Sequence, residues 1–105
     1  MMIAVLYDFE LKPGHFSEYK QQWEEMVSFL RTRGAVGSAV HREGDRRVVI
    51  YSRWPDLETY HLSWPKEHEW GSKLPPAIAH VAQAMKASIA TEVVTTVLSV
   101  EGSTF

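Results

Sequence analysis

The beginning of the chain alternates between apolar and other residues in a way that predicts a β-strand. Every second position from 3 to 11 carries an aliphatic or aromatic side chain: Ile3, Val5, Tyr7, Phe9 and Leu11. A period of two residues is typical of a strand whose two faces meet different surroundings. The Pro13-Gly14 pair then ends the alternation, because neither residue suits the interior of a strand.

After this break the spacing changes to that of an amphipathic helix. Large apolar side chains fall on one helical face at Phe16, Tyr19, Trp23, Met26, Val27 and Leu30. Charged and polar residues occupy the opposite side of the same segment. Arg31 and Arg33 precede Gly34, and cations followed by glycine are a common ending for a helix. We therefore expect a helix that begins at Phe16 and ends before Gly34.

Two strands joined by a tight turn follow the helix. Residues 36–42 and 46–53 contain β-branched and aromatic residues that suit a pleated, half-buried surface. The connection Glu43-Gly44-Asp45 is short and has a central glycine, which is a hairpin signal.

The second of these strands leads directly into a capped helix. Pro55 stops the strand, and Asp56 can accept hydrogen bonds from the free N–H groups of a first helical turn. We expect this helix over residues 56–63. Two large rings, Trp54 and Tyr60, are thereby fixed at a strand-to-helix corner. Such corners leave room for small ligands in layered folds.

The rest of the chain predicts further helix and a final strand. Pro65 is expected to begin a second short helical piece as its first residue, and residues 71–76 are expected to form a loop. Pro76 can begin a last helix with one apolar face, composed of Ile78, Val81, Ala82, Met85 and Ile89. The β-branched run over residues 91–100 predicts a strand that is apolar on both sides.

This order, β-α-β-β-α-(α)-β, predicts an α+β fold of the ferredoxin-like kind with a four-stranded antiparallel sheet. The 105 residues are expected to form one domain. Helices on one face leave the other face bare, and Ala4, Leu6, Ala39 and Val49 can add to the apolar side of the last strand. Because monomers rarely expose so large an apolar face, we expect a homodimer in which two sheets pack together.

Charge and composition exclude several classes of function. The formal net charge of −2 argues against a nucleic-acid partner. No apolar run approaches the ~20 residues that cross a bilayer, and the apolar start lacks the basic region of a signal peptide. Cysteine is absent, which excludes disulfides, thiolate nucleophiles and zinc–thiolate sites. We therefore expect a cytoplasmic protein with neither a nucleic-acid nor a membrane partner.

Four motifs together resemble the antibiotic biosynthesis monooxygenase family of dimeric α+β barrels. They are Phe9-Glu10-Leu11-Lys12-Pro13-Gly14, Trp23 inside the first helix, Gly34-Ala35-Val36-Gly37-Ser38 leading to His41-Arg42, and Tyr51-Ser52-Arg53-Trp54-Pro55-Asp56-Leu57-Glu58-Thr59-Tyr60. The resemblance spans nearly the whole chain, so it implies a single domain of this family over residues 1–105. It also implies the homodimer expected above.

The resemblance implies a chemistry that needs no cofactor. Characterised members oxidise polycyclic aromatic phenols without metal, flavin or haem, and the deprotonated substrate itself gives an electron to dioxygen. The protein need only bind a flat phenol, favour its anion and exclude bulk water. Trp54 and Tyr60 match the family's corner pattern, but Ile50 stands where that pattern has Asn. No Arg occurs after Arg53, which leaves Lys73 as the cation near the expected place.

We therefore expect a small cofactor-independent monooxygenase that oxidises an aromatic or quinol-type molecule. The catalytic candidates are Trp54, Tyr60 and His80, the last as a general base because an unperturbed histidine pKa of ~6.5 suits proton removal from a phenol. The candidate substrate-binding residues are Tyr7, Trp23, Ile50, Tyr51, Arg53 and Trp64. In place of the missing amide, Tyr7, Tyr51, Arg53 or His80 would stabilise the anion.

The same residues also allow a non-catalytic interpretation. Trp54 and Tyr60 can be plain core residues under the helices, and Trp23 lies on the apolar stripe of its helix. The competing function is therefore a dimeric small-molecule-binding module that uses the same cavity without turnover. Ile50 favours this alternative, because its side chain cannot form a hydrogen bond.

Metal and haem chemistry are not expected. His61 and His68 are seven residues apart with Glu67 and Glu69 nearby, but this spacing matches no tight ligand motif. A haem-opening branch of the fold uses an Asn, a Trp and an iron-ligating His. Trp64 and His68 lie too close together in the sequence for that pattern, so haem degradation is not expected.

Overall fold

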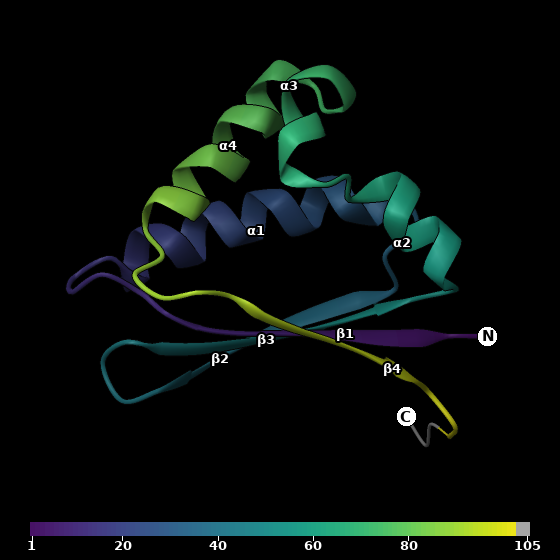
Figure 1. Cartoon of the computed structure of the whole chain (residues 1–105), viewed down its shortest axis with the longest axis horizontal. Helices are drawn as coiled ribbons and strands as arrows, with labels where there is room; N and C mark the ends of the chain where they lie inside the picture. The colour runs from purple at the N-terminus through teal and green to yellow at the C-terminus, as the bar shows by residue number, and fades with distance from the viewer. Residues whose placement is uncertain (103–105) are drawn as a thin grey trace.

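Four antiparallel strands form one sheet in the order β2-β3-β1-β4, and the helices lie on one side of it (Figure 1). The computed structural model describes residues 1–102. Along the chain the elements are β1 (Ile3–Glu10), α1 (Phe16–Thr32), β2 (Gly37–Glu43), β3 (Arg47–Trp54), α2 (Leu57–Ser63), η1 (Glu67–Glu69), α3 (Trp70–Lys73), α4 (Pro76–Ala87) and β4 (Val94–Ser99). The predicted α+β ferredoxin-like fold is confirmed.

The strand register decides which side chains face the helices. β1 lies between β3 and β4, and Tyr7 stands opposite Ile50 while Val5 stands opposite both Ser52 and Val97. Along β3 every second residue from Val48 to Trp54 is buried. Because strand side chains alternate between faces, these positions form the floor on which α1 and α4 pack.

Helix α1 has the boundaries that its apolar stripe predicts. It runs from Phe16 to Thr32, with Tyr19 and Met26 buried against the sheet and α4. The chain then reverses at Gly34, whose φ of +110° lies in the region that favours glycine.

The corner between β3 and α2 also has its predicted construction. The carboxylate of Asp56 accepts a hydrogen bond from the backbone N–H of Thr59 at 2.7 Å, which caps the helix. This bond to the charged form lowers the pKa of Asp56. The cap fixes the direction in which α2 leaves the sheet, and with it the position of Tyr60.

Two predicted boundaries differ from the structure. The helical piece after Pro65 begins at Glu67 and not at the proline, and the expected loop over residues 71–76 is partly helical because α3 covers Trp70–Lys73. The Trp70 ring lies 5.6 Å from the Trp64 ring, and its indole N–H donates to the Pro65 carbonyl at 3.2 Å. These contacts hold the segment in place and extend its helical part beyond residue 70.

The last strand also begins later than predicted, at Val94 and not at residue 91. The hydroxyl of Thr91 accepts a hydrogen bond from the backbone N–H of Glu10 at 2.8 Å, and the N–H of Ala90 donates to the Glu10 carbonyl. These bonds hold residues 89–91 to the end of β1 outside the regular β4 ladder.

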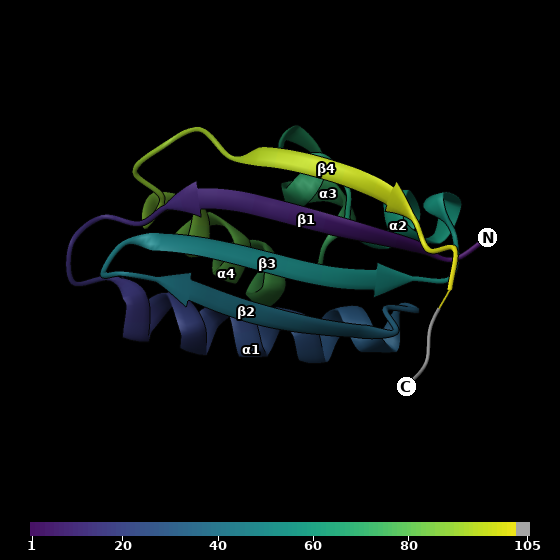
Figure 2. The same ribbon diagram turned by 90° about the horizontal axis from the view of Figure 1, so that it is seen from below.

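The face of the sheet opposite the helices is uncovered in the protomer (Figure 2). Val94 and Leu98 stand opposite Asp8 and Ala4 on this face, and their side chains are 62% and 49% exposed. At one end of the face, Arg47 forms ion pairs with Asp8 and Glu43. Within the described residues no helix is long and apolar enough to span a bilayer.

Candidate functional site

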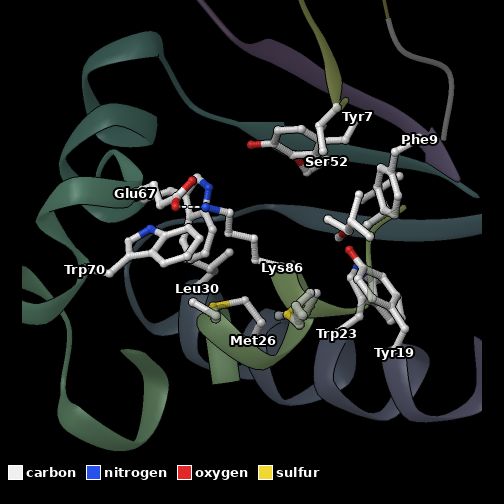
Figure 3. A pocket seen from close by; sticks show the side chains of 18 of the residues that line it. Tyr7, Phe9, Tyr19, Trp23, Met26, Leu30, Ser52, Glu67, Trp70 and Lys86 are labelled. Atoms are coloured by element: carbon white, nitrogen blue, oxygen red, sulfur yellow. Dashed lines mark hydrogen bonds and ion pairs between the residues drawn. The ribbon is translucent and has the colours of Figure 1, made fainter. Parts of the chain in front are cut away.

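A cavity of about 490 Å³ lies between the sheet and the helices (Figure 3). Its sheet wall is formed mainly by Tyr7, Phe9, Ile50, Ser52 and Trp54. Its helical wall is formed mainly by Tyr19, Trp23, Met26 and Leu30 from α1, and by Ala82, Met85 and Lys86 from α4. The walls are therefore largely aromatic and aliphatic, with a few polar groups, as in many small-molecule sites.

Trp54 lines the cavity with a fully buried ring. Its side chain is only 1% exposed, and its ring meets that of Tyr60 edge-to-face, with 5.3 Å between the centroids. Its indole N–H donates to the Ser52 hydroxyl at 3.3 Å, and that hydroxyl donates to the Val5 carbonyl at 3.4 Å. Because its N–H is already bonded within the protein, Trp54 offers a ligand only its ring.

Tyr7 brings a phenolic hydroxyl to the sheet wall of the cavity, which Ser38 and Ser52 also line. This hydroxyl lies 2.5 Å from the hydroxyl of Tyr60, which stands behind it and does not itself line the cavity. Burial raises the pKa of Tyr7, and the neighbouring Tyr60 raises it further. Burial also raises the pKa of Tyr60, although its hydrogen bond with Tyr7 opposes the shift. Both phenols are therefore neutral near pH 7 and cannot act as bases. When Tyr60 is the donor of their shared hydrogen bond, the Tyr7 O–H remains available to a ligand.

Two aromatic side chains that carry polar atoms, Tyr19 and Trp23, line the cavity from α1. The indole nitrogen of Trp23 is buried and has no hydrogen-bond partner among the described residues. Tyr19 is one helical turn earlier on the same face, and burial raises the pKa of its hydroxyl. Figure 3 shows both side chains extending from α1 towards the strands.

The outer side of the cavity is formed by the segment before α4. Trp64 and Trp70 line it, and an ion pair between Glu67 and Lys86 joins η1 to α4 there. The sequence suggested Lys73 as the cation near the site. In the structure Lys73 instead pairs with Glu69 and does not line the cavity, so Lys86 is the cation that reaches it.

The structure brings together most of the residues that the sequence singled out. Tyr7, Trp23, Ile50, Trp54 and Trp64 all line the cavity, and Tyr60 contacts it through Tyr7 and Trp54.

Three candidates lie elsewhere. Tyr51 and Arg53 alternate with Ile50 and Ser52 along β3, so they belong to the uncovered face of the sheet. His80 is exposed on α4 and does not line the cavity, because α4 turns its alanines, Ala79 and Ala82, inward. The expectation that His80 faces the cavity as a base is therefore corrected.

Sequence reasoning did not identify four of the polar residues around the cavity. These are Tyr19, Ser52, Glu67 and Lys86. The signal for Tyr19 was available, because it shares the stripe of Trp23 at a spacing of four residues. Nothing local marks Lys86, since its partner Glu67 is 19 positions away in the chain. Within residues 1–102 no group of three His, Asp or Glu side chains could hold a metal ion.

Comparison with known proteins agrees with this geometry. The family model for antibiotic biosynthesis monooxygenases matches residues 2–72. No curated protein matches the chain. Among solved structures, SnoaB from Streptomyces nogalater, a cofactor-independent oxygenase, aligns with a TM-score of 0.75 at 14% identity, over 97% of this chain and 95% of that one.

Two further structures show the same similarity. Rv0793 from Mycobacterium tuberculosis aligns with a TM-score of 0.70 at 18% identity, over 98% of both chains. A putative antibiotic biosynthesis monooxygenase from Caulobacter crescentus CB15 aligns with a TM-score of 0.71 at 15% identity, over 95% of this chain and 91% of that one. At these identities the likeness establishes the fold.

Proposed function

The chain belongs to the antibiotic biosynthesis monooxygenase family, and from that premise we propose that it oxidises a flat aromatic or quinol-type molecule with dioxygen, using no bound cofactor. The observation that carries the proposal is the aromatic cavity of about 490 Å³ with the Tyr7 hydroxyl on its wall. SnoaB, described as a cofactor-independent oxygenase, shares the fold.

Binding of a planar substrate follows from the cavity's shape and lining. Its volume lies within the roughly 300–1,000 Å³ of small-molecule pockets. Trp54 and Ile50 form part of one wall, and Met26 and Leu30 form part of the other. A fused ring system between these walls exchanges water for apolar contacts on both faces, at about 25 cal/mol per Å² of buried apolar area.

Activation of the substrate rests on the Tyr7 hydroxyl. A neutral O–H donor stabilises a phenolate or enolate more than its neutral parent, because a hydrogen bond to a charged group is worth about 1.5–3 kcal/mol. In this role the Tyr60 hydroxyl donates to the Tyr7 oxygen, which holds the Tyr7 hydroxyl in place and leaves its own O–H free to donate to the substrate. The ionisable groups that line the cavity, other than tyrosines, are Glu67, Lys86 and Glu92, so the inner wall offers no histidine or carboxylate as a base. The substrate must therefore be acidic enough to ionise when such donors stabilise its anion.

The reaction balances with dioxygen alone as oxidant. The carbanion of an anthrone-type substrate gives one electron to dioxygen, and the resulting radicals combine to form a peroxide at the ring carbon. Loss of water from this peroxide leaves a carbonyl at that carbon. One oxygen atom stays in the quinone product, and the other leaves as water with the two hydrogens that the carbon carried.

The assembly that we propose for this function is a homodimer through the uncovered face of the sheet. Val94 and Leu98 are exposed there, and Leu6, Val49 and Tyr51 extend the apolar surface across the strands. Pairing with a second copy would cover this surface, which a monomer would leave in water.

A non-catalytic binding module is the second candidate. Ile50 favours it, because this side chain lines the cavity but cannot polarise a substrate oxygen. The absence of a base from the described inner wall favours it as well.

Oxygen consumption with a panel of anthrones and hydroquinones separates the two functions. We expect wild-type protein to exceed the uncatalysed rate, and Tyr7→Phe to lower the rate about tenfold or more because it removes the anion's donor. Tyr51→Phe, which removes a hydroxyl on the uncovered face, should leave the chemistry unchanged. Tight binding with no consumption above background would instead establish the binding module.

A further inference from the structure

We infer that residues 66–73 form a lid on the outer side of the cavity, and that the ion pair between Glu67 and Lys86 is the latch that holds this lid closed. The inference goes beyond the proposed function, because it concerns how a molecule enters and leaves the cavity. It therefore applies equally to an oxygenase and to a binding module.

The first observation is that the lid has little buried surface. Its two helical pieces, η1 and α3, are described in full and contain no buried residue, whereas α1, α2 and α4 each bury two. The residues that flank the lid, Pro65 and Leu74, are both buried. A segment with few buried contacts between two fixed ends can open locally while the rest of the domain stays folded.

The backbone changes from helical to extended at each end of the lid. Lys66, before η1, has φ and ψ of −64° and 153°, and Leu74, after α3, has −108° and 148°. Hinges absorb a movement through changes of φ and ψ at a few element-terminal residues of this kind. The Pro75-Pro76 pair follows directly, and its fixed φ angles limit how far the movement reaches into α4.

Bonds inside the lid allow it to move as one piece. The Glu69 carboxylate pairs with Lys73 and accepts a hydrogen bond from the Lys66 backbone N–H at 3.3 Å. The Ser72 hydroxyl donates to the Glu69 carbonyl at 3.1 Å. These bonds join η1 to α3, and none of them needs to break when the lid moves away from α4.

The lid meets the cavity through an aromatic ring. Trp70 lines the cavity, its ring lies 5.6 Å from that of Trp64, and it packs against the apolar cluster that contains Leu74 and Ala82. A movement of the lid that carries Trp70 outward therefore opens this wall of the cavity.

The latch is the polar contact between the lid and α4. Glu67 belongs to η1 and Lys86 to the last turn of α4, and both side chains line the cavity (Figure 3). Among the described residues, the other side-chain hydrogen bonds and ion pairs of the lid stay within residues 65–73. The side chains of Lys86 and Glu67 are 57% and 55% exposed, so their pairing shifts an equilibrium by at most about fivefold. A latch of this strength permits frequent opening.

Stopped-flow binding of N-phenyl-1-naphthylamine tests the lid, because this fluorescent probe is uncharged and does not respond directly to a change of charge. We expect Lys86→Met to raise the association and dissociation rates by the same factor, about two- to fivefold, and to leave Kd unchanged. A latch controls passage without altering the closed cavity. Lys73→Met is the matched control, because it breaks an ion pair inside the lid, and it should leave both rates unchanged.

Exchange of the two charges tests the latch itself. Glu67→Lys alone and Lys86→Glu alone place like charges across the latch, so each should raise both rates. The double variant restores an ion pair of opposite sense and should return both rates to those of the wild type.

Amide hydrogen exchange measures lid opening without a probe. Lys86→Met should speed the exchange of the lid amides about two- to fivefold and leave those of α1 unchanged. Unchanged binding rates in Lys86→Met, a faster dissociation rate alone with a weaker Kd, or equal acceleration by Lys73→Met would each overturn the inference. Faster exchange in α1 as well as in the lid would also overturn it, because the variant would then have lost global stability. If the probe does not bind wild-type protein, hydrogen exchange decides alone.

Discussion

Ile50 stands directly opposite Tyr7 in the pairing of β3 with β1, and both side chains line the same cavity. The family's corner pattern has an amide at the position of Ile50, whereas in this chain the neighbouring strand supplies a hydroxyl instead. At this point of the cavity β1 therefore supplies a hydroxyl and β3 an apolar side chain.

Ile50→Asn should restore a hydrogen-bonding side chain beside Tyr7. We expect turnover of a test anthrone to rise about tenfold, because a hydrogen bond to a developing anion is worth roughly 1.5–3 kcal/mol. The protein should also melt earlier, because Ile50 is 6% exposed and burial of an unsatisfied amide costs roughly 1–3 kcal/mol. Val48→Asn, on the same buried face of β3 but outside the cavity lining, is the control and should lose stability without gaining activity. If neither variant gains turnover, Ile50 is a packing residue only.

Light scattering coupled to size-exclusion chromatography tests the dimer. The 12.0 kDa chain should elute at about twice its own mass. Leu98→Glu should convert it to the protomer mass, because the charge would lie within the proposed interface. Leu62→Glu makes the same change on α2, where the side chain is 72% exposed in the helical layer, and should remain dimeric. A monomeric wild-type protein at micromolar concentration would contradict the proposal.

Stability should fall steeply at alkaline pH. The pKa values of Tyr7, Tyr19 and Tyr60 are raised by burial. Their contribution to stability is therefore complete below the unfolded pKa of about 10, and it is lost as the pH rises above that value towards the folded pKa values. Denaturant unfolding between about pH 10 and 12 should show a slope that Tyr7→Phe reduces by about 1.4 kcal/mol per pH unit. If Tyr7→Phe left the slope of unfolding free energy against pH unchanged, the Tyr7 hydroxyl would have the same pKa in the folded and unfolded states.

Gly34→Ala should destabilise the junction of α1 with the corner. The residue has a φ of +110°, and an added Cβ would lie 2.8 Å from the Thr59 methyl carbon. We expect a loss of roughly 1–3 kcal/mol in the free energy of unfolding. Gly71→Ala is the control, because a Cβ there meets nothing within 4 Å and alanine favours the helical conformation. Thr59→Ser removes the methyl group that the added Cβ would meet. In that background Gly34→Ala should therefore cost less, and the remaining loss should be the strain of alanine at a φ of +110°.

Most of the fold follows from local patterns that tertiary contacts do not override. The alternation in β1 and the stripe of α1 each predict an element within one or two residues of its observed ends. The cap at Asp56 likewise predicts the start of α2, and thus the corner that carries Trp54 and Tyr60. α3 was not predicted, because its order comes from contacts of Trp70 with Trp64 and Pro65 that the sequence does not show.

The site was less predictable, because the two faces of this sheet are chemically similar. Tyr7 and Tyr51 are both strand tyrosines, and only the register and the placement of the helices decide that Tyr7 faces the cavity. His80 was misplaced because its neighbour Ala79 and the later Ala82 face the core, whereas consecutive side chains of a helix point in different directions and His80 is turned to the outside. Lys86 depends on an ion pair with a distant segment, which no local pattern reveals.

Turnover of an anthrone under dioxygen labelled with heavy oxygen tests the central claim most directly. The account predicts that each quinone formed carries one labelled oxygen atom and that one labelled water is released with it, with no added metal, flavin or haem. The amount of labelled quinone formed per unit time should fall in Tyr7→Phe and stay the same in Tyr51→Phe. Quinone that forms no faster than in buffer would contradict the claim, and so would dioxygen that is returned as hydrogen peroxide while the product stays unlabelled.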